Sequence, residues 1–129
     1  MDRRQSLLAS AVVLALGAFA GTAWAQNYPN KVIKLQVPFA PGSTTDIVAR
    51  VIAEPLGKAL GQSVIVENRP GAGSNLATEI VARSPADGYT ILLATLGALV
   101  ISPMVMRLPI DPARDLVPVG IAWDLPNVV

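Results

Sequence analysis

The chain has 129 residues, ten Lys or Arg against nine Asp or Glu, and neither histidine nor cysteine. Its length predicts a single domain. The missing histidine and cysteine exclude Ser-His-Asp and Cys-His relays and any His or Cys metal site. The balanced charge, without a basic patch interleaved with aromatic residues, gives no sign of nucleic-acid binding.

The first 25 residues have the features of an export signal. Basic Arg3-Arg4 precedes the uncharged apolar run 7–20, and Ala23-Trp24-Ala25 fits a signal-peptidase site with cleavage after Ala25. The run is shorter than the roughly 20 residues of a membrane span, which disfavours a retained anchor. Twin-arginine export is a weaker alternative, because Ser6 stands where a large apolar residue is expected. We therefore expect residues 26–129 to reach the periplasm.

The first predicted unit is a strand, a loop and a helix. Apolar and polar residues alternate in 32–37, which predicts a strand with Gln36 on its polar face. Apolar residues recur at three- and four-residue spacing from 46 to 60, as on one face of a helix, and Gly61 is a natural helix stop. Pro55 lies inside this helix and predicts a kink or two shorter helices.

The rest of the chain repeats this order. The remaining predicted elements are a strand at 63–67, a glycine-rich loop at 68–75, a helix near 75–84, a strand at 89–94, a small-residue loop at 95–98, an apolar stretch at 99–106 that suits a helix on either side of Ser102-Pro103, a capped turn at 111–116 and a fourth strand at 117–123. Strands that alternate with helices predict a parallel α/β sheet. Ligands in such sheets bind outside the carboxyl ends of the strands, where all three small-residue loops lie.

The loop before the first helix is the main candidate binding site. Hydroxyl and carboxylate side chains follow Gly42 at the start of the helix, in the order Ser43, Thr44, Thr45, Asp46. The unpaired N–H groups and positive dipole end of a helix suit an anion such as a carboxylate. A loop that merely caps its helix is the simpler alternative. For Asp46, an N-cap role is favoured over general-base catalysis.

Two other features of the sequence are better explained by structure than by ligand binding. Gly71-x-Gly73 is part of a dinucleotide fingerprint, but Leu76 stands where its third glycine belongs. We therefore expect no cofactor. Trp123 is expected in the core rather than at a ligand. Because the three loops hold no nucleophile–base pair, they predict binding and not catalysis.

Five motifs occur in order along the mature chain: Tyr28-Pro29-x-Lys31, Val37-Pro38-Phe39-x-Pro41-Gly42-x-x-Thr45-Asp46, Val66-Glu67-Asn68-Arg69-Pro70-Gly71-Ala72-Gly73, Asp87-Gly88-Tyr89-Thr90 and Pro126-Asn127-Val128. In these motifs the chain resembles the solute-binding proteins of the tripartite tricarboxylate transporters, the Bug-type periplasmic receptors. The resemblance implies a type II periplasmic-binding-protein (Venus flytrap) fold whose first domain is a mainly parallel sheet flanked by helices. It also implies a monomer that closes two domains over a small organic acid and delivers it to membrane transporter subunits.

The resemblance further implies which residues bind the ligand. In the family, the loop after the first strand and the loop after the third or fourth strand hold a ligand carboxylate, partly through ordered waters. By position, 40–46 and 95–98 would lie at the carboxylate, and 73–75 would line the same crevice. The implied ligand-binding residues are Ala40, Gly42, Ser43, Thr44, Thr45, Asp46, Gly73, Ser74, Asn75, Thr95, Leu96, Gly97 and Ala98. No catalytic, metal-binding or cofactor-binding residue is implied.

The chain departs from the family in three respects. The family's first loop is usually richer in glycine, where this chain has Ser43-Thr44. The family's third loop carries Thr-His-Ala, where this chain has Ala98-Leu99-Val100, so two polar positions are lost. Family members are also longer, so we expect 26–129 to be the N-terminal part of domain I, truncated near the hinge and lacking the second domain. Two alternatives stay open: an exported non-functional remnant of such a receptor, and an exported hydrolase that uses Ser43 or Asp46.

Overall fold

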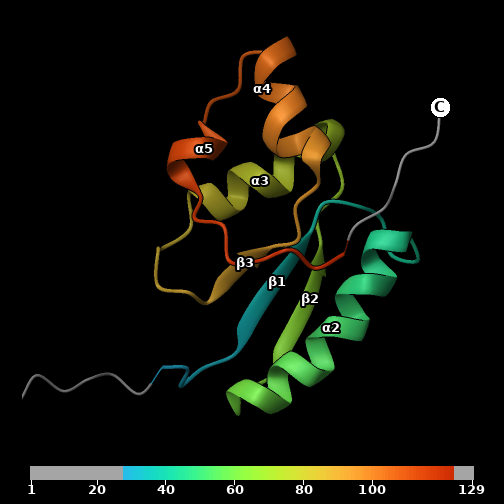
Figure 1. Cartoon of the computed structure of the whole chain (residues 1–129), viewed down its shortest axis with the longest axis vertical. Coiled ribbons are helices and arrows are strands. Elements are labelled where there is room, and N and C mark those ends of the chain that lie inside the picture. The colour runs from blue at the N-terminus through green and yellow to red at the C-terminus, as the bar shows by residue number, and fades with distance from the viewer. Residues whose placement is uncertain (1–27, 124–129) are drawn as a thin grey trace, which may run out of the picture.

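The structure is a computed structural model that describes residues 28–123. Its centre is a parallel sheet of β1 (Ile33–Val37), β2 (Val64–Asn68) and β3 (Thr90–Leu92) in the order β2-β1-β3 (Figure 1). This confirms the predicted α/β class with a parallel sheet. The predicted signal segment 1–25 and the motif at 126–128 lie outside the described residues.

Two longer helices and several short helical pieces surround the sheet. They are α2 (Thr44–Leu60), η1 (Ala72–Ser74), α3 (Asn75–Ala82), η2 (Gly97–Ile101), α4 (Ser102–Val105) and α5 (Pro112–Asp115). α2 packs along β2 and β1, whereas α3 packs against β3 and β1 (Figure 1). The chain therefore leaves the central strand β1 in one direction to reach β2 and then crosses back over it to reach β3. In an open α/β sheet, such a reversal point is where a ligand crevice forms.

The core lies between β1 and α2. Leu35 and Val37 pack with Ala49 of α2 and Leu93, and Trp123 packs against this cluster while partly buried. The expected core position of Trp123 is therefore confirmed. The predicted polar face of the first strand is only partly correct. Gln36 is 2% exposed, because a central strand has neighbours on both edges and helices on its faces.

α2 differs from its prediction at two points. It begins at Thr44, two residues early, and ends as predicted at Gly61, which takes a left-handed φ of 67°. The predicted division at Pro55 is wrong, because one helix runs through it. Pro55 is exposed, and the carbonyl of Val51, which loses its N–H donor, belongs to a residue that is 68% exposed. Water can therefore replace the missing bond.

The fourth predicted strand is absent from the described part of the chain. Residues 117–123 form no strand, although the alternating Val117, Val119 and Ile121 suit one. These three side chains are 86–91% exposed. The alternation fits a strand, but a strand also needs a partner strand, and the described strands pair only with one another.

Other predicted boundaries shift by smaller amounts. The loop predicted at 95–98 is wrong in its second half, because Gly97 and Ala98 lie inside η2, which continues into α4. Helix on both sides of Ser102-Pro103 is confirmed. The capped turn is also confirmed, because Asp111 accepts from the N–H of Ala113 at the start of α5.

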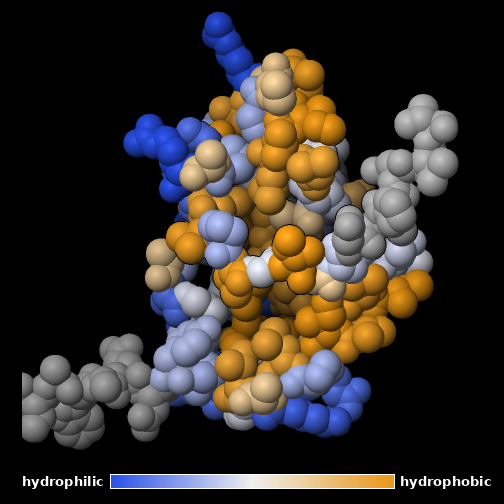
Figure 2. Space-filling view, in the orientation of Figure 1, coloured by the Kyte–Doolittle hydropathy of each residue, from blue (hydrophilic) through white to orange (hydrophobic). Residues whose placement is uncertain are grey.

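Apolar side chains also remain on the surface. Figure 2 shows them over α4 and over α2. Met104 and Val105 of α4 are 80% and 71% exposed, and Ile47 of α2 is 56% exposed. No helix among the described residues is both long and apolar enough to cross a membrane.

Two of the sequence motifs meet at the amino edge of the sheet, away from the loops. The hydroxyl of Tyr28 donates to the carbonyl of Gly88 at 2.8 Å, and Lys31 pairs with Asp87 at 3.0 Å. The Lys31 ammonium also lies 4.2 Å from the ring centroid of Tyr89. These contacts tie the chain before β1 to the turn before β3.

This tie makes Gly88 more sensitive to substitution than other left-handed glycines. A Cβ on Gly88, whose φ is +79°, would lie 2.9 Å from the Tyr28 hydroxyl, whereas a Cβ on Gly61 would have nothing within 4 Å. We expect Gly61→Ala to lower the free energy of unfolding by about 1–2 kcal/mol through left-handed strain alone. Gly88→Ala should cost about 1 kcal/mol more, because Tyr28 is displaced as well. Urea unfolding of both variants measures this, and equal costs would contradict the role of the Tyr28 contact.

Candidate functional site

The carboxyl edge of the sheet carries three loops. Residues 38–43 follow β1, residues 69–71 follow β2 and lead into η1, and residues 93–96 follow β3. The first loop lies in the middle, because β1 is the central strand. η1 and η2, which extend the second and third loops, are in contact. The structure thus brings the three predicted loops to one edge.

The first loop ends in a reciprocal helix cap. Ser43, not Asp46, is the N-cap: its hydroxyl accepts from the N–H of Asp46 at 3.2 Å. Asp46 lies in the first turn and accepts from the N–H of Gly42 at 2.9 Å. The predicted N-cap position of Asp46 is therefore wrong. The Ser-x-x-Asp spacing, which resembles a capping box, is the sequence signal that identifies Ser43.

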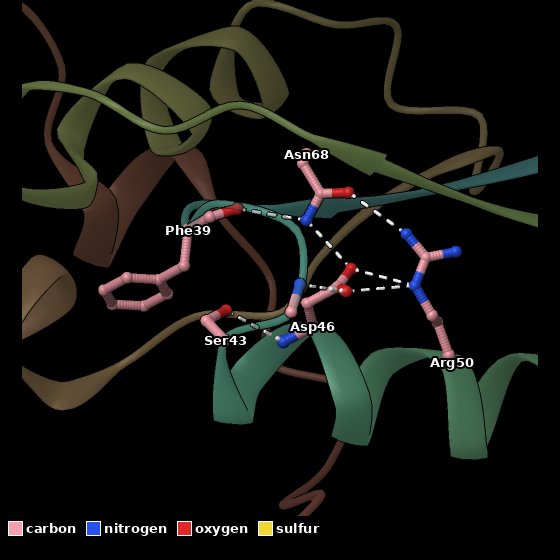
Figure 3. A network of polar contacts seen from close by, with 6 residues as sticks. Phe39, Ser43, Asp46, Arg50 and Asn68 are labelled. Carbon is pink, nitrogen blue, oxygen red and sulfur yellow. Dashed lines mark hydrogen bonds and ion pairs between the residues drawn. The ribbon is translucent and has the colours of Figure 1, made fainter.

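Asp46 is the centre of a polar network (Figure 3). Its carboxylate, with a side chain only 4% exposed, accepts from Nε of Arg50 at 3.0 and 3.1 Å and from Nδ2 of Asn68 at 2.9 Å. The Arg50 bond, followed by the Gly42 N–H and the Asn68 amide, holds the pKa of Asp46 far below its usual range. Such a weakly basic carboxylate, with both oxygens engaged, is a poor general base.

The start of α2 leaves two backbone donors unpaired. The N–H of Gly42 donates to the Asp46 carboxylate, whereas the N–H groups of Thr44 and Thr45 have no acceptor among residues 28–123. They are the first two positions of a 17-residue helix, where N–H groups carry the positive end of the helix dipole. Thr44 is exposed and Thr45 is buried. This helix end can therefore receive an anion at Thr44.

The second loop has an unusual backbone. Four consecutive residues have positive φ: Gly71 (145°), Ala72 (48°), Gly73 (63°) and Ser74 (77°). For Ala72 and Ser74 this conformation costs on the order of 1–2 kcal/mol each. Asn75 begins α3 directly after this run.

Asn75 carries an unpartnered polar atom at the same edge. The side chain is buried, Nδ2 lies 3.5 Å from the sulfur of Met106, and Oδ1 has no hydrogen-bond partner within the described chain. Buried polar atoms are nearly always paired with protein, water or ligand. Asn75 is therefore a candidate to bind water or a ligand.

The third loop contributes less. Its Thr95 carbonyl accepts from the N–H groups of Ala98 and Leu99 and so starts η2. Leu96 is 69% exposed, whereas Ala98 is buried. Among residues 93–96, only Thr95 has a polar side chain.

A shallow depression of about 480 Å³ lies at the far end of α2, between Gly57 and Val64. None of the predicted ligand-binding residues lines it. Residues 28–123 contain no cluster of three acidic side chains that could hold a metal ion.

Comparisons with known proteins agree on one group of relatives. Residues 48–129 match the family described as the tripartite tricarboxylate transporter family receptor. Protein BugT of Bordetella pertussis is 40% identical over 135 residues, which cover 100% of this chain and 40% of BugT. MatC of Rhodopseudomonas palustris, solved with bound malate, is 37% identical with a TM-score of 0.65 over 68% of this chain and 30% of MatC.

A second solved relative is Rpa4515 of the same organism, solved with adipate. It is 46% identical with a TM-score of 0.53 over 54% of this chain and 23% of Rpa4515. The chain thus spans less than half the length of each of these relatives.

The pKa of Asp46 leads to a testable pH dependence. Because it lies below the ordinary aspartate value of 3.8, the charged form stabilises the fold above that value, and this contribution is lost as the pH falls. We expect the free energy of unfolding to fall between about pH 5 and pH 2. Asp46→Asn should be less stable at pH 7 and should depend less on pH in this window. Urea unfolding at several pH values measures both effects.

The matched control is Glu54→Gln, which removes a carboxylate from an exposed pair with Lys58. It should keep the pH dependence of the wild type. The same dependence in Asp46→Asn as in the wild type would show that Asp46 is not the group responsible.

Proposed function

The chain belongs to the receptor family of the tripartite tricarboxylate transporters, and from this membership we propose that it captures a small organic acid by its carboxylate. We place this capture in the periplasm, after cleavage of the export signal, with the membrane subunits of such a transporter as the recipient. The observation that carries the proposal is the pair of unpaired N–H groups, Thr44 and Thr45, at the positive end of α2. The family is one of receptors, which gives no support to the hydrolase alternative.

We propose that residues from all three loops contribute to the binding site. The carboxylate would lie at Thr44, with Thr95 beside it. Ser74 and Asn75 would line the crevice, where the Oδ1 atom of Asn75 could accept from a ligand hydroxyl or from a bound water. Asp46 would support this site rather than touch the ligand, because two carboxylates would repel each other.

The proposed site is one wall of a crevice. The chain spans 30% of MatC and 40% of BugT, and the remaining length of such a receptor would supply the facing wall. We therefore expect this chain to bind its ligand weakly, because only one wall of the crevice contacts the carboxylate. We also expect the chain to be a monomer.

The first test is stabilisation by dicarboxylates. Malate and adipate, which are bound in the solved relatives, should raise the unfolding temperature of the purified chain, with a stabilisation of about 2.7 kcal/mol at 100 times the Kd. The dimethyl ester of malate, which lacks the charges, should have no effect. A cooperative unfolding transition that none of a panel of di- and tricarboxylates and amino acids shifts would contradict the proposal. Absence of any cooperative transition would favour the non-folding remnant.

The second test removes one N–H group and keeps the helix. Thr44→Pro deletes the proposed donor at the first helical position, where proline is well tolerated, and Ser43 before it already has an extended backbone that suits a following proline. We expect malate affinity to fall roughly 10- to 100-fold, as for the loss of one hydrogen bond to a charged group.

Thr44→Ala is the matched control, because it keeps the N–H group and removes the side-chain hydroxyl. Its malate affinity should stay within about threefold of the wild type. Equal losses of malate affinity in the two variants would show that the Thr44 hydroxyl, and not its backbone N–H, binds the ligand.

A further inference from the structure

Asn68, the last residue of β2, holds both ends of the first loop. Its Nδ2 atom donates to the carbonyl of Phe39 at 3.0 Å, just after β1, and to Oδ1 of Asp46 at 2.9 Å, in the first turn of α2 (Figure 3). These two acceptors are separated by the whole turn from strand to helix. A single amide group therefore fixes the distance across the loop.

The orientation of this amide is determined by its neighbours. Oδ1 of Asn68 lies 3.3 Å from a terminal nitrogen of Arg50, while Nδ2 faces a carbonyl and a carboxylate. The flipped amide would direct its oxygen at two acceptors and its NH₂ group at a guanidinium, which has only donors. The observed orientation satisfies all three contacts.

The same network determines where the loop directs its unpaired donors. Asp46, held by Asn68 and Arg50, accepts from the N–H of Gly42, whose φ of +84° turns the chain into α2. The next free N–H group belongs to Thr44. At the other side, the N–H of Arg69 donates to the carbonyl of Val37 at 2.7 Å and keeps the end of β2 against β1.

We propose that Asn68 is a positioning residue: it clamps the loop 38–43 between Phe39 and Asp46 and thereby aims the Thr44 N–H at the ligand. The inference rests on the proposed function for its ligand. The clamp itself is present without any ligand. An aspartate at position 68 would have no donor for either acceptor and would place a carboxylate beside that of Asp46.

The clamp is tested by hydrogen exchange in the ligand-free chain. In the wild type, both side-chain amide protons of Asn68 and the Gly42 N–H should exchange slowly. In Asn68→Asp, the Gly42 N–H should exchange roughly tenfold faster, as for the loss of one supporting hydrogen bond. The N–H groups of Lys34 and Leu93, which donate to the carbonyls of Tyr89 and Gln36 in the sheet, should keep their protection. The control Asn30→Asp leaves the accepting oxygen for the Tyr89 hydroxyl in place. It should change neither the exchange of the Gly42 N–H nor that of the sheet amides.

The second measurement is malate affinity, which should fall roughly tenfold in Asn68→Asp and stay unchanged in Asn30→Asp. Rapid exchange of the Gly42 N–H in the wild type, an equal loss of protection at all amides of Asn68→Asp, or wild-type affinity in that variant would each overturn the inference. If Asn68→Asp does not fold, slow exchange of the wild-type Asn68 amide protons supports the clamp and fast exchange overturns it. If the wild type does not bind malate or any other acid, the proposed function fails, and the exchange data still decide whether the clamp exists.

Discussion

A buried negative charge organises the carboxyl edge of this protein. Removing the Asp46 carboxylate from water is unfavourable unless donors replace the water. Here the replacements come from three places: the backbone of Gly42, the guanidinium of Arg50 and the amide of Asn68. Each donor belongs to a different segment, so satisfying one charge fixes the loop, the helix and the end of β2 relative to one another. The direction of the helix N-terminus, and with it the proposed anion site, depends on this requirement.

The elements that follow from local patterns could be predicted from the sequence, and those that need distant partners could not. The strand that ends at Val37, the helix that follows Ser43 and the stop at Gly61 come from local patterns, and the structure has all three elements. The segment 117–123 has equally good alternation and forms no strand, since pairing depends on a neighbour that the pattern does not contain.

The candidate site divides in the same way. The hydroxyl-rich helix start and the glycine-rich second loop are visible as composition, and their common edge follows from the parallel topology. The contacts of Asn68 with Phe39 and Asp46 join residues 29 and 22 positions apart, which no spacing rule connects. Asp46 therefore looked like a helix cap or a ligand contact in the sequence, whereas in the structure it is committed to holding the loop. The motifs around Tyr28 and Gly88 have a structural task at the amino edge of the sheet, opposite the three loops.

The central position of β1 has a consequence for the order in which the chain can fold. β1 is the first strand of residues 28–123, yet its partners come later: Ile33 lies opposite Val64, and Lys34 lies opposite Thr90. A chain that emerges from its N-terminus during synthesis exposes this apolar strand before its partners and cannot pair its second side until residue 90 has followed. α2, whose contacts along the helix are local, can form in the meantime. The strand at the centre of the sheet therefore cannot gain both of its neighbours until the chain has reached β3.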